Sequence, residues 1–131
     1  MIDFILWSEA FSVGNETIDG QHLQIVDILN ELYAAKGDDS QVAPKHVIAQ
    51  LKRYTETHFA YEEDLMRAAR YPDLESHAKV HSWMTRKTRE LAEHVIGNPD
   101  ALTSEVFDFL KKWWISHIRD IDTRYAPYIS P

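Results

Sequence analysis

The sequence predicts an all-α protein: an up-down-up-down antiparallel four-helix bundle preceded by an N-terminal arm. Apolar residues recur at intervals of three and four along four separate segments, which is the period of a helix with one buried face. The links between these segments are short, and short links make consecutive helices antiparallel neighbours. The chain has 131 residues, so we predict a single domain over residues 1–131.

The first predicted helix covers residues 20–36 and the second covers residues 44–70. Asp19 is a candidate N-cap of the first helix, because a carboxylate there can accept a hydrogen bond from a free backbone N–H. Gly37 is a candidate stop after it, since glycine tolerates the left-handed conformation that ends many helices. Pro44 stands in the first turn of the second helix, where a proline is tolerated.

The third predicted helix covers residues 72–96 and the fourth covers residues 104–125. Asp73 favours the start of the third helix through the helix dipole, and the Gly-Asn-Pro run at residues 97–99 predicts a left-handed cap at its end. Residues 1–18 have no clear period, but they contain large apolar side chains. We therefore expect this N-terminal arm to pack on the bundle.

The composition excludes several classes of function. The chain has no cysteine, which rules out disulfides, iron–sulfur clusters, thiolate zinc sites and cysteine nucleophiles. Its formal net charge is −7 and it has no basic stripe, so we expect no nucleic-acid partner. The first residues lack the basic region of a signal peptide, and no apolar stretch approaches the ~20 residues that span a bilayer. We expect a cytoplasmic protein without a membrane span, present as a monomer or a weak oligomer.

Five of the seven histidines and two carboxylates lie at spacings that let four helices direct them to one place. Residues four apart stand one above the other on a helix, so His58 and Glu62 face the same way, as do His77 and His81. Both pairs lie on the apolar face of their helix and therefore point inward. The complete set is His22, His58, Glu62, His77, His81, His117 and Asp122.

This set predicts a pair of transition-metal ions. A buried imidazole without a partner is costly, and a metal ion removes that cost because it satisfies the ligand lone pairs. A lone core histidine is more often hydrogen-bonded than metal-bound, and that interpretation would suffice for His22 or His117 alone. Five inward histidines in one small bundle have no comparable structural explanation. His46 and His94 turn away from the ligand face at about 100° per residue, so we exclude them.

The number of donors indicates one open coordination position. Two octahedral ions offer about twelve positions. Five histidines, two carboxylates and one bridging oxygen species fill about eleven of them, provided that both carboxylates bridge. Imidazole and bridging carboxylates favour iron, and a vacancy beside a redox-active pair suits a diatomic ligand.

Motifs spread over nearly the whole chain carry a family resemblance. They are Trp7, Val13-Gly14, the run from Ile18 to His22, the run from His58 to Glu63, Tyr71-Pro72, His77 with His81, the run from Trp114 to Ile118, and Asp122. The combination H…HxxxE…HxxxH…HxxxxD resembles the hemerythrin family, most closely its single-domain bacterial members, the bacteriohemerythrins.

The resemblance implies two non-haem iron ions, joined by a bridging oxo or hydroxo group, that bind O2 reversibly. By position, three histidines would hold the fully coordinated iron, two histidines would hold the iron with the vacancy, and two carboxylates would bridge the ions. The fully coordinated iron would be held by His77, His81 and His117, and the iron with the vacancy by His22 and His58. The bridging carboxylates would be Glu62 and Asp122.

Asp122 conflicts with regular helical geometry. A straight helix places the third or fourth residue after His117 above it, which favours Asp120, whereas Asp122 is turned away by about 140°. The family pattern selects Asp122. Both interpretations agree if the helix widens into a π-type turn between His117 and Asp122, and we predict such a turn.

The neighbours of the site receive weaker assignments. Glu63 is expected at the surface. Tyr125 is expected to serve packing, with a role beside the ligands as the alternative. Trp113, four residues before His117, is expected to wall the site, while the adjacent Trp114 faces a different way.

The predicted function is reversible O2 binding, as a carrier, a buffer or a store that supplies an O2-consuming protein. The alternatives are a di-iron enzyme that acts on peroxide or nitric oxide, and a sensor whose O2 occupancy alters contact with a partner. The sequence shows no second polar cluster that would shape a substrate site, so we expect no enzymatic activity. The chain shows no output domain, so we do not expect it to act as a sensor by itself.

Overall fold

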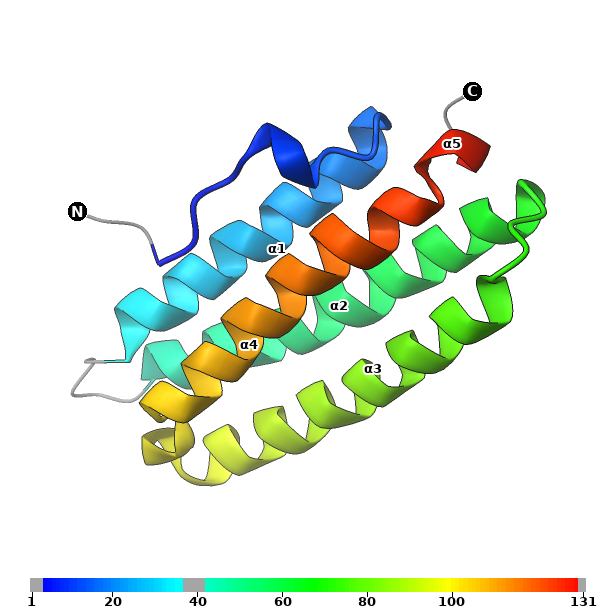
Figure 1. Ribbon diagram of the computed structural model, residues 1–131. Coiled ribbons are helices and arrows are strands. Elements are labelled where there is room, and N and C mark those ends of the chain that lie inside the picture. Colours follow the sequence, from blue (N-terminus) through cyan, green and yellow to red (C-terminus); the bar gives the residue numbers. More distant parts are fainter. Residues whose placement is uncertain (1–3, 37–41, 130–131) are drawn as a thin grey trace.

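Four long helices lie side by side in the computed structural model, which describes residues 4–36 and 42–129 (Figure 1). Consecutive helices run antiparallel, which confirms the predicted up-down-up-down bundle. They are α1 (Glu16–Ala35), α2 (Val42–Ala68), α3 (Leu74–Gly97) and α4 (Ser104–Ser116). Within the described ranges, none of the helices has the length and apolar character that a membrane crossing requires.

Short elements precede, join and continue these helices. η1 (Glu9–Phe11) lies in the N-terminal arm, and η2 (Pro99–Ala101) lies between α3 and α4. After α4 the helical path continues through three short pieces, η3 (His117–Ile121), η4 (Asp122–Arg124) and α5 (Ala126–Ile129). η3 is a π-helix and η4 is a 3-10 helix. The predicted fourth helix is therefore one path whose winding changes along its length.

The start of α1 is set by Asn15 and not by Asp19, so the predicted N-cap is wrong. The Asn15 side chain accepts a hydrogen bond from the backbone N–H of Ile18 (3.0 Å), which is the N-cap interaction. Asp19 lies inside the helix and binds the arm. Its carboxylate accepts hydrogen bonds from the hydroxyl of Ser12 (2.6 Å) and the backbone N–H of Val13 (2.8 Å).

The N-terminal arm packs on the bundle over its described residues, as predicted. The Ile5 N–H donates to Asn30 Oδ1 (2.7 Å), and Asn30 Nδ2 donates to the Ile5 carbonyl (3.0 Å). Phe4 stacks on Tyr33 with ring centroids 4.3 Å apart. η1 packs against η3, so the arm supports the segment that begins with His117.

Two predicted helix stops differ from the structure or lie outside it. α3 runs through Gly97, and the following Asn98 is extended (φ −153°), so the left-handed cap predicted at residues 97–99 is wrong. A left-handed residue does follow α2, where Arg70 has a φ of 56°. Gly37, the predicted stop of α1, lies outside the described residues.

The core consists of two apolar clusters separated by a polar layer. The larger cluster occupies most of the bundle and includes Ile25, Leu51, Met84 and Trp114. The smaller cluster closes the other end of the bundle and consists of Val13, Ile18, Met66, Tyr71 and Tyr125. The predicted donors lie between these two clusters, so the fold places buried polar groups in one layer across all the long helices.

Candidate metal centre

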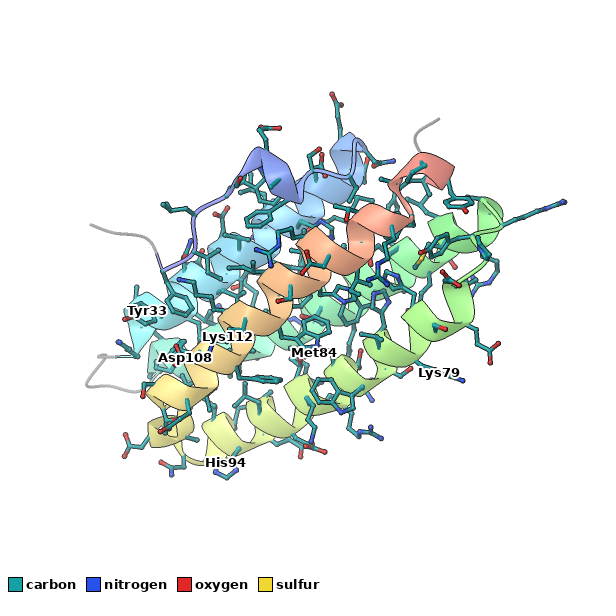
Figure 2. All side chains as sticks on the ribbon, in the orientation of Figure 1. Tyr33, Lys79, Met84, His94, Asp108 and Lys112 are labelled. Atoms are coloured by element: carbon teal, nitrogen blue, oxygen red, sulfur yellow. The ribbon has the colours of Figure 1, made fainter. Side chains whose placement is uncertain are left out.

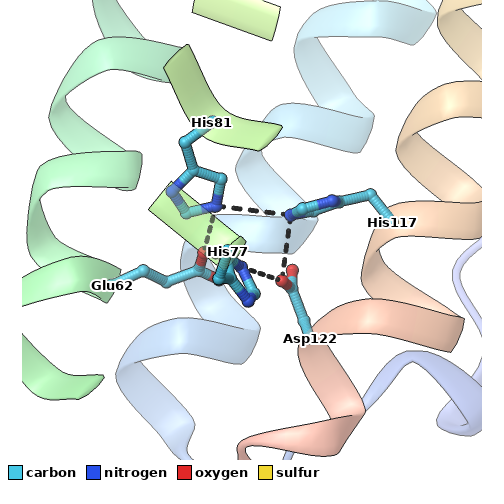
Figure 3. A group of neighbouring side chains, drawn as sticks. All are labelled: Glu62, His77, His81, His117 and Asp122. Atoms are coloured by element: carbon cyan, nitrogen blue, oxygen red, sulfur yellow. Dashed lines mark hydrogen bonds and ion pairs between the residues drawn. The ribbon is translucent and has the colours of Figure 1, made fainter. Parts of the chain in front are cut away.

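All seven predicted donors meet in this buried layer, and each is at most 3% exposed. Their ligand atoms form two groups, within each of which the atoms lie within 4.8 Å of one another. The three-histidine group, drawn in Figure 3, is Glu62, His77, His81, His117 and Asp122. The two-histidine group is His22, His58, Glu62 and Asp122. The two carboxylates belong to both groups.

Ordinary helical spacing brings together the donors of α2 and α3. His58 and Glu62 are four residues apart on α2, and His77 and His81 are four apart on α3. Each pair therefore projects from one face of its helix. His22 reaches the same layer from α1.

His117 and Asp122 come together through the predicted π turn. The backbone N–H of Asp122 donates to the carbonyl of His117, five residues earlier, in the π-helix η3. The wider turn brings the fifth residue over the first, so both side chains enter the cluster. Asp120, which a regular helix would favour, is exposed and pairs with Arg119 (3.0 Å). The prediction of a π turn is confirmed.

On the two-histidine side, the nitrogens face one oxygen of each carboxylate. His22 Nε2 lies 3.0 Å from Glu62 Oε2 and 3.0 Å from Asp122 Oδ2. His58 Nε2 lies 3.3 Å from the same Glu62 oxygen. These contacts use Oε2 and Oδ2 only.

On the three-histidine side, the nitrogens face the other oxygen of each carboxylate. His81 Nε2 lies 3.1 Å from Glu62 Oε1. Asp122 Oδ1 lies 3.1 Å from His77 Nε2 and 3.0 Å from His117 Nε2 (Figure 3). Each carboxylate therefore turns one oxygen to each group, which is the arrangement of a bridging ligand.

Several of these buried atoms have no hydrogen bond of acceptable geometry. They are His58 Nε2, His77 Nε2, Glu62 Oε1 and both carboxylate oxygens of Asp122. A buried polar atom without a partner costs about 1–3 kcal/mol. Cations in the two groups would satisfy these atoms, and imidazole nitrogen with carboxylate oxygen suits first-row transition metals. The residues present therefore fit a pair of metal ions.

The charges of the cluster favour protonated histidines beside ionised carboxylates when no metal is bound. Burial lowers the pKa of His22 and His77, but contacts with Asp122 and Glu62 outweigh it and raise both pKa values to about 9. Burial raises the pKa of Glu62 and Asp122, but the surrounding histidines outweigh it and hold both pKa values below their ordinary range. Metal binding would release the histidine protons, because a ligand nitrogen must be deprotonated.

Two of the histidines donate a hydrogen bond from Nδ1, the ring nitrogen that faces away from the cluster, to side chains for which the sequence predicted no such contact. His58 Nδ1 donates to Gln21 Oε1 (2.7 Å), and His81 Nδ1 donates to Glu63 Oε2 (2.9 Å). A proton on Nδ1 leaves the Nε2 lone pair facing the cluster, which is the tautomer that a metal requires. The side chain of Glu63 is 25% exposed, so it reaches the surface as expected, and it also accepts a hydrogen bond from a donor histidine. Each contact joins two different helices, and no spacing along one helix could have revealed it.

Tyr125 also contacts a donor. Its hydroxyl donates to Glu62 Oε2 (2.6 Å), and the residue is 1% exposed. Burial and the nearby charges of Glu62 and Asp122 raise the pKa of the Tyr125 hydroxyl, so it remains a hydrogen-bond donor. Tyr125 therefore has both roles, packing in the smaller apolar cluster and a hydrogen bond to a donor.

Aromatic side chains wall the cluster. Trp113 stacks on His117 with ring centroids 4.5 Å apart, as predicted. Trp114, predicted to face a different way, is 1% exposed, and its ring centroid lies 6.5 Å from that of His58. Phe59 stacks on His81 with ring centroids 3.8 Å apart. Trp113 and Trp114 thus face different ways, as predicted, with ring planes 83° apart, and each lines the site beside a different histidine.

The two remaining histidines lie apart from the cluster, as predicted. His46 and His94 are both exposed. Figure 2 shows His94 pointing away from the bundle near the end of α3. They provide natural control positions for experiments on the cluster.

Comparison with protein families matches residues 13–129 to the Hemerythrin HHE cation binding domain. The chain belongs to the hemerythrin family. All seven donors fall within the matched residues, and the description of a cation-binding domain agrees with their geometry. The single domain over residues 1–131 stays a prediction.

Curated members of the hemerythrin family resemble the chain over most of its length. A bacteriohemerythrin from Stenotrophomonas maltophilia is 32% identical over 125 residues, covering 95% of this chain and 81% of that protein. A bacteriohemerythrin from Pseudomonas aeruginosa is 33% identical over 122 residues, covering 93% and 79%. A myohemerythrin from Theromyzon tessulatum is 29% identical over 119 residues, covering 91% and 88%.

Solved hemerythrin structures share the fold. A crystal structure of wild-type hemerythrin superposes with a TM-score of 0.89 at 24% identity, covering 98% of this chain and 99% of that chain. A crystal structure of a hemerythrin mutant superposes with a TM-score of 0.91 at 23% identity, covering 99% and 100%. The bundle is therefore the hemerythrin fold.

Proposed function

We propose that the seven donors bind two iron ions and that the protein binds O2 reversibly, as a carrier, a buffer or a store. The supporting observation is that the two groups are unequal. The three-histidine group has five members and the two-histidine group has four, with both carboxylates shared. One bridging oxo or hydroxo group would complete about six positions in the first group and about five in the second, and an octahedral ion takes six. The open position would then belong to the ion that His22 and His58 would hold.

The donor set favours reversible binding. Iron would supply the redox chemistry, because two ferrous ions can lend electrons to O2 and recover them on its release. Five neutral imidazoles bring less negative charge than the glutamates of carboxylate-rich di-iron bundles. A less anionic set favours the reduced ions, so it disfavours irreversible oxidation.

The chain also keeps water from the open side. His22 and His58 are at most 1% exposed. Surface hollows of about 510, 450 and 310 Å³ are lined by His117, His81 and His77, all in the three-histidine group. These hollows lie on the side of the cluster where the coordinatively complete ion would be bound. Exclusion of water and protons from the other ion slows the loss of reduced oxygen species.

The buried ionisable groups support O2 binding over an enzymatic role. Among the described residues they are the seven donors, Tyr71 and Tyr125. With the donors engaged and Tyr125 bonded to Glu62, no acid–base pair remains to act on a substrate. The proposal also includes a cytoplasmic location, a monomer or weak oligomer, and an O2-consuming protein as recipient.

Metal analysis combined with oxygenation tests the proposal. We expect iron at about two ions per chain, and a visible band that appears with O2 and disappears when O2 is removed. His58→Ala should abolish the band, whereas His94→Ala alters an exposed histidine and should leave it unchanged. A single ion, or zinc with no response to O2, would contradict the proposal. Irreversible bleaching with turnover of peroxide or nitric oxide would indicate an enzyme.

A further inference from the structure

The two groups of donors differ in the charge of the side chain that accepts a hydrogen bond from Nδ1 of one of their histidines. In the three-histidine group, His81 Nδ1 donates to the carboxylate of Glu63 at 2.9 Å. In the two-histidine group, His58 Nδ1 donates to the amide oxygen of Gln21 at 2.7 Å. Each acceptor comes from the preceding helix, so the two contacts are alike in construction and differ in charge.

A charged acceptor changes the imidazole as a ligand. A hydrogen bond to an ionised acceptor is roughly twice as strong as one between neutral groups. It draws the Nδ1 proton outward and leaves more electron density on Nε2, which makes the ligand more basic. A more basic ligand stabilises the more highly charged state of a metal ion. His81 is therefore a stronger donor than His58.

We propose that Glu63 is a positioning residue that makes the ion of the three-histidine group the easier one to oxidise, while Gln21 keeps the ion with the open position electron-poor. This inference rests on the proposed di-iron function. Glu63 thereby sets how readily the pair lends electrons to O2. Its charge raises O2 affinity, and the neutral Gln21 limits permanent oxidation of the ion that meets O2.

The surroundings of Glu63 leave its charge directed at His81. Among the described residues, Glu63 forms its ion pair with His81, and the two arginines that line the same hollow, Arg86 and Arg89, form none with it. Glu56 lines the same hollow of about 450 Å³, but its carboxylate is paired with Arg89 at 2.6 Å. Solvent reaches part of the Glu63 side chain, which is 25% exposed, and the bonded imidazole is buried. Through this hydrogen bond, the negative charge of Glu63 acts on the buried imidazole of His81.

Three isosteric substitutions test the role of charge. Glu63→Gln keeps the shape and an acceptor oxygen but removes the charge. In the iron-loaded protein we expect a higher midpoint potential and an O2 half-saturation pressure about tenfold higher. Gln21→Glu should shift both quantities the opposite way. Glu56→Gln removes a charge from the same hollow without touching a histidine, so it should leave both unchanged.

Two results of this series would overturn the proposal. One is an unchanged potential in both Glu63→Gln and Gln21→Glu. The other is an equal shift in Glu63→Gln and Glu56→Gln, because it would trace the effect to the general field of the hollow. Gln21→Glu carries the test alone if Glu63→Gln fails to fold.

Zinc separates this inference from the proposed function, because Zn²⁺ accepts the same donors without redox chemistry. Glu63→Gln should weaken Zn²⁺ binding about tenfold in a competition titration. It should also move the proton resonance of His81 Nδ1–H upfield, and Glu56→Gln should do neither. If these changes occur in a protein that shows no O2 binding, the proposed function fails and the role of Glu63 in tuning the ligand stands. An unchanged zinc affinity and an unchanged His81 resonance would overturn that role.

Discussion

Asp122 donates its backbone N–H to the carbonyl of His117, and this one hydrogen bond brings both side chains into the same buried cluster. Between them in sequence, Asp120 faces solvent and pairs with Arg119. A regular helix, with bonds four residues back, would favour Asp120 above His117. The local winding therefore decides which carboxylate the two metal groups share.

Substitution of Asp122 should weaken metal binding, whereas substitution of Asp120 should not. Asp122→Asn removes an anionic donor that belongs to both groups. Loss of a residue that merely supports a ligand costs about 10–100-fold in metal affinity, so loss of this one should exceed that range. Asp120→Asn changes an exposed residue and should retain full iron. Iron per chain after equilibration with a chelator measures the effect. Equal iron content in the two variants would argue against a shared role for Asp122.

Tyr125→Phe should destabilise the metal-free protein. The hydroxyl donates to the buried Glu62 Oε2 at 2.6 Å, and its loss removes one of the donors to that buried carboxylate and leaves its place unfilled. We expect a decrease of about 1–3 kcal/mol in the free energy of unfolding, measured by urea denaturation. Tyr128→Phe is the matched control, since Tyr128 is 48% exposed and should be neutral. A neutral Tyr125→Phe would show that the contact contributes nothing to stability.

The stability of the metal-free protein should decrease as the pH rises above neutrality. The pKa values of His22 and His77 are raised from 6.5 to about 9, so the folded state binds their protons more tightly than the unfolded state. Their contribution is complete below pH 6.5 and is lost as the pH rises through about 9. Urea unfolding at about pH 6 and about pH 9.5 measures this loss, and equal stabilities would contradict it.

The carboxylates impose the opposite dependence in acid. The pKa values of Glu62 and Asp122 are lowered, so their contribution is present above the ordinary carboxylate pKa of about 4 and is lost as the pH falls below it. The metal-free protein should therefore be most stable in mildly acidic solution. Bound metal would replace the histidine protons, so metal affinity should rise with pH. This rise should occur above neutrality, where the stability of the metal-free protein decreases.

Trp113→Gln should shorten the lifetime of the oxygenated protein. Trp113 stacks on His117 and lines the hollow of about 510 Å³ beside it, so a polar replacement admits water toward the cluster. We expect the O2-dependent band to decay about tenfold faster in air. Trp83→Gln is the control, because Trp83 is 38% exposed and contacts Phe109, outside the cluster. The same decay rate in both variants would count against a shielding role.

The donors themselves could be predicted from sequence because their spacing is local. His58 with Glu62, and His77 with His81, share a face whenever their helices form, whatever the rest of the chain does. The family pattern selected Asp122, and the conflict of that choice with regular helical spacing was itself enough to predict the π turn. The start of α1 could not be predicted so directly. Asn15 and Asp19 are both capable caps, and only contact with the arm shows that Asp19 binds there instead.

The contacts around the donors depended on tertiary structure. Gln21 with His58, Glu63 with His81, and Tyr125 with Glu62 join residues 37, 18 and 63 positions apart. Such contacts require a particular rotation of each helix about its axis and a particular offset from its neighbour, which only the packing of the whole core sets. The sequence by itself determined which side chains can bind metal and which helices carry them, because helical periodicity is a local property. The tertiary structure alone decided which side chains hold those donors, and with what charge, because neighbouring helices must pack before they can meet.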